Sequence, residues 1–367
     1  MRDILEKIDW LTAGGAIFLA ILGMVVMSIT PAAPSGMVGR QVLFLVVGIL
    51  VMLAARFLNF EALRLNTPAL MIWYVAMVAL LASVLFFGTE VRGSRSWFSF
   101  PPFTIQPSEF AKIIGILLLA KYFSYRHAEL YRVWHILGSV FYMAVLVVLV
   151  ALEPDFGTAL LMMLTWLGMV VVAGLPLRRL LAVLGVLAIA ATALWVFVLA
   201  PYQQERVLSF LSPTRDPLGA GYNQKQALIA IGSGGLKGQG LGGAYQAKLG
   251  FLPEAHTDFI FAASGEVFGA VGLVVIMGVL VLILWRLMAF AFLTHDNALV
   301  PPSNFGRLFA VGLAILILVE SGINMGMNLG LLPVTGVPLP FMSSGGSHLL
   351  AFFLGLGVYQ SFYSRTR

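Results

Sequence analysis

Residues 259–292 read FIFAASGEVFGAVGLVVIMGVLVLILWRLMAFAF, an apolar run of 34 residues with only two charged side chains, Glu266 and Arg286. At about 1.5 Å per residue, a helix of this length is roughly 51 Å long, whereas the hydrocarbon core of a bilayer is about 30 Å thick. We therefore expect a membrane helix whose first turns, with Ser264, Glu266 and Gly269, stand outside the lipid or line a cavity.

Similar apolar runs recur along the whole chain. Of its 367 residues, 60% are hydrophobic and 10% are charged, against about 25% charged in soluble proteins, which argues against a water-soluble fold. The sequence predicts an all-α integral membrane protein with a single domain over residues 1–367. About ten transmembrane helices are expected, at 10–30, 38–56, 66–88, 108–124, 134–152, 157–175, 179–200, 260–290, 305–328 and 346–363.

The distribution of basic residues predicts the orientation. Ten spans put both termini on one side, and 13 of the 22 Lys and Arg residues fall on that side, with four in the short opposite loops and five in the long loop after span seven. The positive-inside rule then places both termini in the cytoplasm and makes the large loop, about 202–258, extracytoplasmic.

The basic residues are scattered singly, so nucleic acid is not an expected partner. Without cysteine, the chain has no disulfide and no thiolate metal site.

Two aspartates lie directly before predicted helices. Asp258 ends the stretch Leu252-Pro253-Glu254-Ala255-His256-Thr257-Asp258, where it either caps the following helix or acts as a general base at the membrane face. Asp155, in Glu153-Pro154-Asp155-Phe156-Gly157-Thr158, is explained by helix capping alone, and a functional role is the alternative.

Polar side chains also fall within predicted membrane helices. Glu109 and Lys112 are three residues apart on one helix face, as an ion pair or as part of a functional site, because ionisable groups in membrane helices normally face the protein interior. Glu320, Asn324 and Asn328 recur every fourth residue and form a polar stripe. This stripe is expected to join helices together or, alternatively, to contact a substrate. His348 is expected at the membrane interface.

The long loop is rich in glycine between Gly219 and Gly242 and carries basic residues that include Arg206 and Lys237. Successive backbone N–H groups beside cations can bind phosphate oxygens. The alternative is that the glycines only form tight turns.

Six motifs together resemble the signature segments of the SEDS family (shape, elongation, division and sporulation), in order along nearly the whole chain. They are Gln106-Pro107-Ser108-Glu109-Phe110-Ala111-Lys112, residues 153–160 (EPDFGTAL), 216–222 (DPLGAGY), 230–235 (AIGSGG), 252–261 (LPEAHTDFIF) and 330–347. Residues 324–327 (NMGM) and 338–341 (PLPF) resemble the rod-shape branch of this family more than its cell-division branch.

The resemblance implies a ten-helix peptidoglycan glycosyltransferase of the bacterial cytoplasmic membrane. Such an enzyme polymerises lipid II into glycan strands for cell-wall elongation and rod shape, with its active site on the outer face and a class B penicillin-binding protein as partner. It implies that Asp258 is the catalytic base and that Glu109, Lys112 and Asp155 line the same cavity. Further substrate-binding or supporting residues are expected at Arg206, Lys237, His256, Thr257 and Ser344.

The identity of the cation that neutralises the leaving diphosphate stays open in this reading. Lys112, Arg206 or a divalent cation such as Mg or Mn could serve, and Glu109 or Asp258 are the candidate metal ligands. The chain departs from the family pattern at Val267, where a second acidic residue is common, and at Ser344, where the family has tyrosine.

The alternative functions are a lipid II flippase, a division-specific polymerase and a scaffold for a synthase.

Overall fold

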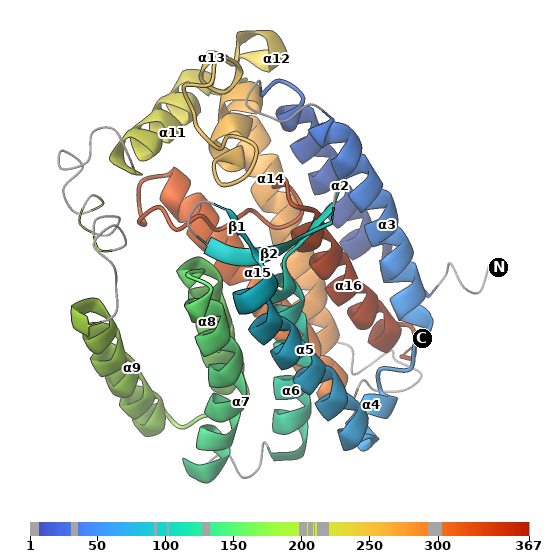
Figure 1. The fold of residues 1–367 in the computed structure, drawn as a ribbon. Coiled ribbons are helices and arrows are strands. Elements are labelled where there is room, and N and C mark those ends of the chain that lie inside the picture. The colour runs from blue at the N-terminus through green and yellow to red at the C-terminus, as the bar shows by residue number, and fades with distance from the viewer. Residues whose placement is uncertain are drawn as a thin grey trace.

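Ten long helices follow the ten predicted spans, with ends that differ by at most three residues from the expected ones. The computed structural model describes residues 7–30, 36–91, 94–100, 103–126, 133–197, 220–292 and 303–366, together with 204, 208 and 210. The ten helices are α2 (Trp10–Met27), α3 (Met37–Phe57), α5 (Thr67–Phe87), α6 (Pro107–Arg126), α7 (Val133–Leu152), α8 (Phe156–Val172), α9 (Leu177–Phe197), α14 (Ile260–Phe292), α15 (Asn304–Asn328) and α16 (Gly346–Tyr363) (Figure 1).

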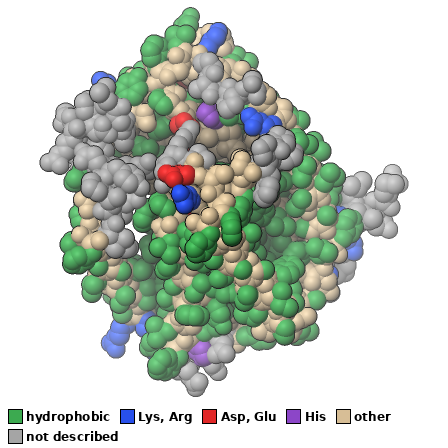
Figure 2. Space-filling model, in the orientation of Figure 1, with side chains coloured by type: hydrophobic (Ala, Val, Ile, Leu, Met, Phe, Trp, Pro, Cys, Tyr) green, Lys and Arg blue, Asp and Glu red, His purple; other side chains and the backbone are tan. Residues whose placement is uncertain are grey.

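The composition of these helices makes the chain a multi-pass membrane protein. Seven of them, within the part of the chain that the structure describes, are long and apolar enough to cross a bilayer. The other three are α8, which is apolar but has 17 residues, and α6 and α16, which carry buried polar side chains. Figure 2 shows a broad region of hydrophobic side chains over the middle and lower part of one face, with charged side chains above it and at its lower edge.

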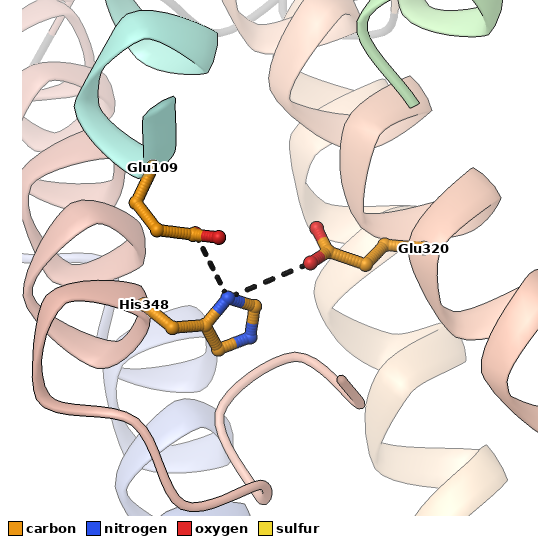
Figure 3. A group of neighbouring side chains, drawn as sticks. All are labelled: Glu109, Glu320 and His348. Atoms are coloured by element: carbon orange, nitrogen blue, oxygen red, sulfur yellow. Dashed lines mark hydrogen bonds and ion pairs between the residues drawn. The ribbon is translucent and has the colours of Figure 1, made fainter. Parts of the chain in front are cut away.

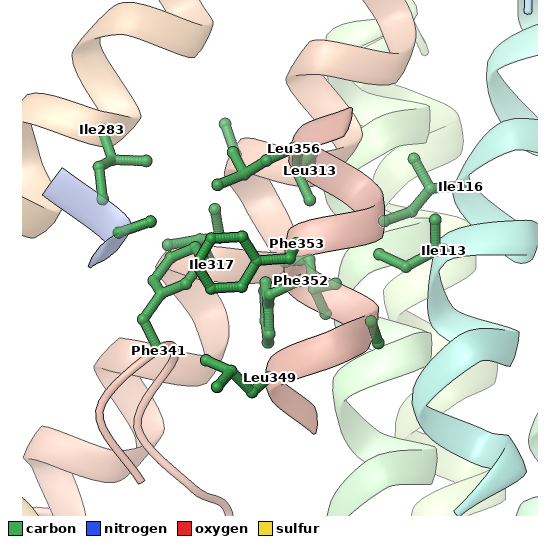
Figure 4. Packing of buried hydrophobic residues seen from close by; sticks show 14 of the residues in the cluster. Ile113, Ile116, Ile283, Leu313, Ile317, Phe341, Leu349, Phe352, Phe353 and Leu356 are labelled. Carbon is green, nitrogen blue, oxygen red and sulfur yellow. The ribbon is translucent and has the colours of Figure 1, made fainter. Parts of the chain in front are cut away.

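The core lies around α15, which packs against α6, α8, α14 and α16. Two thirds of its apolar stretch is buried, whereas no residue in the apolar stretch of α9 is. Phe341, from the segment before α16, fills the space beside Phe352 and Phe353, and the rings of Phe341 and Phe352 lie 5.2 Å apart (Figure 4). In a membrane this packing is favourable through close van der Waals contact, since lipid tails are as apolar as these side chains.

Short elements absent from the predicted fold cover one end of the bundle. An antiparallel sheet of β1 (Thr89–Val91), β2 (Ser94–Phe100) and β3 (Phe103–Ile105) follows α5. Ser96 Oγ of this sheet donates to the carbonyl of Glu153, and Ser347 Oγ donates to the carbonyl of Thr104. The described part of the long loop contains α11 (Ala220–Gly234), α12 (Gly240–Gly243) and α13 (Tyr245–Lys248). Between residues 220 and 258, the segment predicted as a loop thus contains three helices.

A kink divides α14 after the first turns, which were expected to stand outside the lipid or to line a cavity. Gly269 has φ 67° inside the helix, and the turn after α11 packs against it so closely that a side chain at Gly269 or at Gly238 would overlap backbone atoms. Residues 260–267, on the N-terminal side of the kink, are all buried. These first turns of α14 are therefore packed inside the protein.

A polar contact closes the opposite end. Asp9, just before α2, is 2% exposed and accepts hydrogen bonds from Arg286 Nε at 3.2 Å and from Tyr359 Oη at 2.8 Å. Its backbone N–H donates to Gln360 Oε1 at 2.9 Å. The first and last membrane helices therefore meet at their terminal ends, as an even number of spans requires. Buried Tyr359 and Gln360, with the partly exposed Arg286, thus satisfy the carboxylate and main chain of the buried Asp9.

Candidate functional site

The segment before α14 is held by its backbone carbonyls. Ser344 N donates to the His256 carbonyl at 2.9 Å, and Ser343 Oγ donates to the Thr257 carbonyl at 2.6 Å. The Thr257 hydroxyl in turn donates to Glu254 Oε2 at 3.0 Å. These bonds join residues 256–258 to the segment before α16, which the sequence places more than 80 residues later.

The next carbonyl, that of Asp258, accepts two hydrogen bonds from α15. Asn324 Nδ2 lies 2.9 Å from it and Asn328 Nδ2 lies 3.0 Å from it. Both asparagines are fully buried. With three successive carbonyls bound, the main chain at Asp258 has little freedom, and its carboxylate is presented from a fixed backbone.

The two predicted functional aspartates border the same segment, residues 335–337. A side-chain carbon at Gly336 would lie 3.6 Å from Asp258 Oδ2. A side-chain carbon at Gly157 would lie 3.0 Å from the Thr335 carbonyl and 3.9 Å from Asp155 Oδ1. The close approach to Thr335 favours glycine at position 157, whereas Gly336 is favoured by its positive φ of 76°.

Four ionisable side chains form a buried cluster between α6, α15 and α16. Lys112 Nζ lies 2.8 Å from Glu109 Oε2 and 3.3 Å from Glu320 Oε1. His348 Nδ1 lies 2.9 Å from the same Glu109 oxygen and 3.5 Å from Glu320 Oε1 (Figure 3). None of the four is more than 4% exposed. The predicted Glu109–Lys112 pair is confirmed. His348, which was expected at the membrane interface, is buried within the protein and contacts two carboxylates.

Gln106 connects this cluster to Asp155. Its Nε2 donates to Asp155 Oδ2 at 2.9 Å, and its backbone N–H donates to Ser347 Oγ at 3.0 Å, next to His348. Asp155 also caps α8 by accepting the Thr158 N–H at 3.1 Å, which confirms the capping interpretation. Capping and a place in the polar network coexist, so the two interpretations of Asp155 do not exclude each other.

Glu153, two residues earlier, is a buried acid that sequence reasoning did not single out. Burial, with a smaller contribution from the neighbouring Asp155 carboxylate, raises the pKa of Glu153 to about 8. Burial also raises the pKa of Asp155, although the bond from Thr158 opposes this shift. At neutral pH Glu153 therefore holds its proton, and the region near Asp155 carries one negative charge fewer than its sequence indicates.

The charge cluster does not fit a divalent cation as it stands. Donor atoms of Glu109, Glu320 and His348 lie within 4.8 Å of one another, and two carboxylates with an imidazole are a common ligand set for transition metals. However, the Lys112 ammonium already contacts both carboxylates. A metal ion would have to displace it. Asp258, the other predicted ligand, belongs to no such group among the described residues.

The remaining predicted residues lie apart from the cluster or cannot be placed. Lys237 is exposed in the turn between α11 and α12. Arg206 lies outside the described residues. His256 is buried, with its Nε2 4.0 Å from Glu254 Oε2. The structure thus brings Glu109, Lys112 and Asp155 into one network and holds Asp258 beside it through α15.

These features define a polytopic membrane protein with a fixed carboxylate at one end of the bundle and a buried charge cluster beneath it. The family model described as "Cell cycle protein", which covers the FtsW, RodA and SpoVE proteins, matches residues 6–366. The chain belongs to this FtsW/RodA/SpoVE family.

Relatives in this family match most of the length of the chain. The chain is 39% identical over 288 residues, 78% of this chain and 72% of the relative, to the probable peptidoglycan glycosyltransferase FtsW of Thiomicrospira cyclica. It is 36% identical over 301 residues, 80% of this chain and 77% of the relative, to the peptidoglycan glycosyltransferase MrdB of Escherichia coli.

Among solved structures, a chain of a peptidoglycan synthase complex that coordinates polymerization and crosslinking matches with a TM-score of 0.81, 35% identity and 97% coverage of both chains. The rod shape determining protein RodA of Thermus thermophilus matches with a TM-score of 0.71 and 31% identity, over 98% of this chain and 97% of that chain.

The buried cluster predicts how charge balance governs folding. Lys112→Met leaves Glu109 and Glu320 buried without their shared ammonium, and we expect a loss of roughly 3 kcal/mol of stability. Removing one carboxylate as well, in Lys112→Met/Glu320→Gln, should recover most of this loss. The measurement is the midpoint of thermal unfolding in detergent, with Lys225→Met at an exposed site as the control. Equal midpoints for the single and double variants would contradict the charge-balance account.

Glu153 predicts a pH dependence of stability. Because its pKa is about 8 in the folded protein and near 4.5 when unfolded, its contribution is fully present below pH 4.5 and is lost progressively as the pH rises to 8. Glu153→Gln should remove this slope, which is at most about 1.4 kcal/mol per pH unit. Thermal midpoints of both proteins between pH 5 and pH 9 test this, and parallel curves would rule it out.

Proposed function

We propose that this membrane peptidoglycan glycosyltransferase polymerises lipid II with Asp258 as the general base. The observation that carries the proposal is the fixation of Asp258: the carbonyls of residues 256–258 are all bound, and its Oδ2 lies beside the glycine of segment 335–337. A general base has to be held within hydrogen-bond reach of the proton that it removes. Helix capping alone would not need this support.

The proposed reaction transfers a glycan chain from one lipid diphosphate carrier to the next substrate. Asp258 takes the proton from the 4-hydroxyl of the acceptor N-acetylglucosamine. The resulting oxygen forms a bond to the anomeric carbon of the donor N-acetylmuramic acid, and the bond from that carbon to the diphosphate oxygen breaks. Undecaprenyl diphosphate leaves with the electron pair, and the proton remains on Asp258 until water removes it.

Lys112 is the proposed cation for the diphosphate. Its contact with Glu109, at 2.8 Å, is shorter than its contacts with the two Glu320 oxygens, at 3.3 and 3.5 Å. In the proposed step, a phosphate oxygen takes the place of Glu320 at Lys112, which keeps Glu109 as its partner. Developing negative charge on a leaving group is stabilised most in a water-poor site such as this one. No step in this proposal needs a metal ion.

The orientation follows from the arrangement of the two ends. α16 begins beside residues 256–258 and ends at Asp9, about 27 Å away for 18 residues. The positive-inside rule puts the Asp9 end in the cytoplasm. We propose that Asp258, the sheet and α11–α13 face the outside of the cytoplasmic membrane, where glycan strands are assembled.

A class B penicillin-binding protein is the proposed partner. The similar chain in the solved peptidoglycan synthase complex supports this, because that complex combines polymerization with crosslinking. Strand polymerisation by the present chain would supply the glycan that such a partner crosslinks.

The reaction predicts a loss of activity when Asp258 can no longer accept a proton. Asp258→Asn, which keeps the size of the side chain, should lower the rate of glycan polymerisation from purified lipid II at least 100-fold with the partner present. Glu90→Gln, at an exposed carboxylate of the sheet, is the matched control and should keep the rate of the wild type. Equal polymer from Asp258→Asn and the wild type would remove Asp258 from this role, and lipid II transfer across vesicles without polymer would favour a flippase.

Residues 324–327 and 338–341 favour a role in elongation over one in division. We expect the chain to restore rod shape in a bacterium depleted of its RodA, and not to restore septa in one depleted of its FtsW. Cell dimensions under the microscope are the measurement. Restoration of division alone would assign the chain to the division branch.

A further inference from the structure

The polar stripe of α15 makes or breaks no bond and moves no proton in the proposed reaction, yet it is fully buried. Glu320, Asn324 and Asn328 each have 0% exposure, and helix geometry spreads them over about 12 Å along the axis. Glu320 contacts Lys112, whereas both asparagines contact the carbonyl of Asp258. One face of α15 thus contacts both residues to which the reaction is assigned, Lys112 and Asp258.

The carboxamide of Asn328 lies between the two backbone groups that would otherwise form the first hydrogen bond of α14. In a continuous helix the Ala262 N–H would donate to the carbonyl of Asp258, four residues earlier. Here the Ala262 N–H donates to Asn328 Oδ1 at 3.0 Å, and Asn328 Nδ2 donates to the Asp258 carbonyl at 3.0 Å. The ordinary pattern begins one residue later, where Ala263 N donates to the Phe259 carbonyl at 3.0 Å. The carboxamide of Asn328 therefore takes the place of a helical bond and keeps Asp258 out of the helix.

Asn324 ties the same carbonyl to the segment on the other side of the carboxylate. Its Nδ2 donates to the Asp258 carbonyl at 2.9 Å and to the Val337 carbonyl at 2.8 Å. Val337 follows Gly336, which borders Asp258 Oδ2. The backbone of Asp258 and the wall facing its side chain are thus fixed to one amide group.

We propose that Asn328, with Asn324, is a positioning residue for Asp258, and the idea rests on the proposed function of that aspartate. Without the carboxamide of Asn328, the Ala262 N–H and the Asp258 carbonyl can bond to each other. Helix α14 would then begin earlier, and each residue added to it turns the chain by about 100°. The carboxylate would turn away from segment 335–337 while the bundle stayed folded.

The test measures lipid II polymerisation by the full-length protein with its partner. Asn328→Leu, which removes the hydrogen bonds to Ala262 and Asp258 together with that to the Asn324 carbonyl, should lower kcat about 100-fold and change KM less than about threefold, because misplacing a reacting group by about 1 Å costs this much. Ser321→Ala is the matched control, since Ser321 Oγ is buried on the same helix without a hydrogen-bond partner. If Asn328→Leu does not fold, Asn328→Asp, which keeps the shape and the Oδ1 acceptor, is measured instead.

A double variant separates positioning from a general structural role. If Asn328 acts through Asp258, Asn328→Leu/Asp258→Asn should be no slower than Asp258→Asn alone, since effects of groups that act as a unit do not add. Wild-type kcat in the Asn328 variant, or a further loss in the double variant as large as in the single one, would overturn the proposal. Full activity of Asp258→Asn would instead overturn the proposed function, which keeps the two failures distinct.

Discussion

Buried polar groups in a lipid-embedded helix have to find partners inside the protein, because hydrocarbon offers none. This constraint acts most strongly on α15, where a carboxylate and two carboxamides lie on one fully buried face. Each of them is satisfied by a different neighbour: a lysine of α6, the start of α14 and the segment before α16. The helices around α15 are therefore oriented by hydrogen bonds as well as by packing.

The apolar pattern predicted the helices well, since a span is encoded locally by its own composition. For α16 the expected and observed ends coincide at Gly346 and Tyr363. The small sheet was missed because its strands are three to seven residues long and owe their pairing to neighbours such as Glu153 and Ser347. In the long loop, the content of glycine and lysine led to the prediction of a loop where α11–α13 form. The stability of these helices depends on contact with α14.

The site was predictable in its residue types but not in its pairings. The three-residue spacing of Glu109 and Lys112 predicted their contact, and the position of Asp155 predicted that it caps α8. By contrast, His348 meets Glu109 across 239 residues of sequence, and no local periodicity reports such a contact. In the sequence, the family motif at 330–347, with the predicted site residue Ser344, pointed to this end of α16 but not to the contact of His348 with Glu109 and Glu320.

The close seam between α14 and the turn after α11 bears on how this family member can diverge. At Gly238 and Gly269 the two backbones are in direct contact. Any residue larger than glycine at these positions would overlap the backbone of the other segment. Glu266 adds to the seam by accepting the N–H groups of Gln246 and Ala247. In the same unit, the side chains of Leu236 and Leu241 are exposed, although the Leu236 carbonyl accepts the Val271 N–H within the seam. Selection can therefore change the exposed side chains of α11–α13, and with them the proteins that this surface contacts, without disturbing the seam with α14.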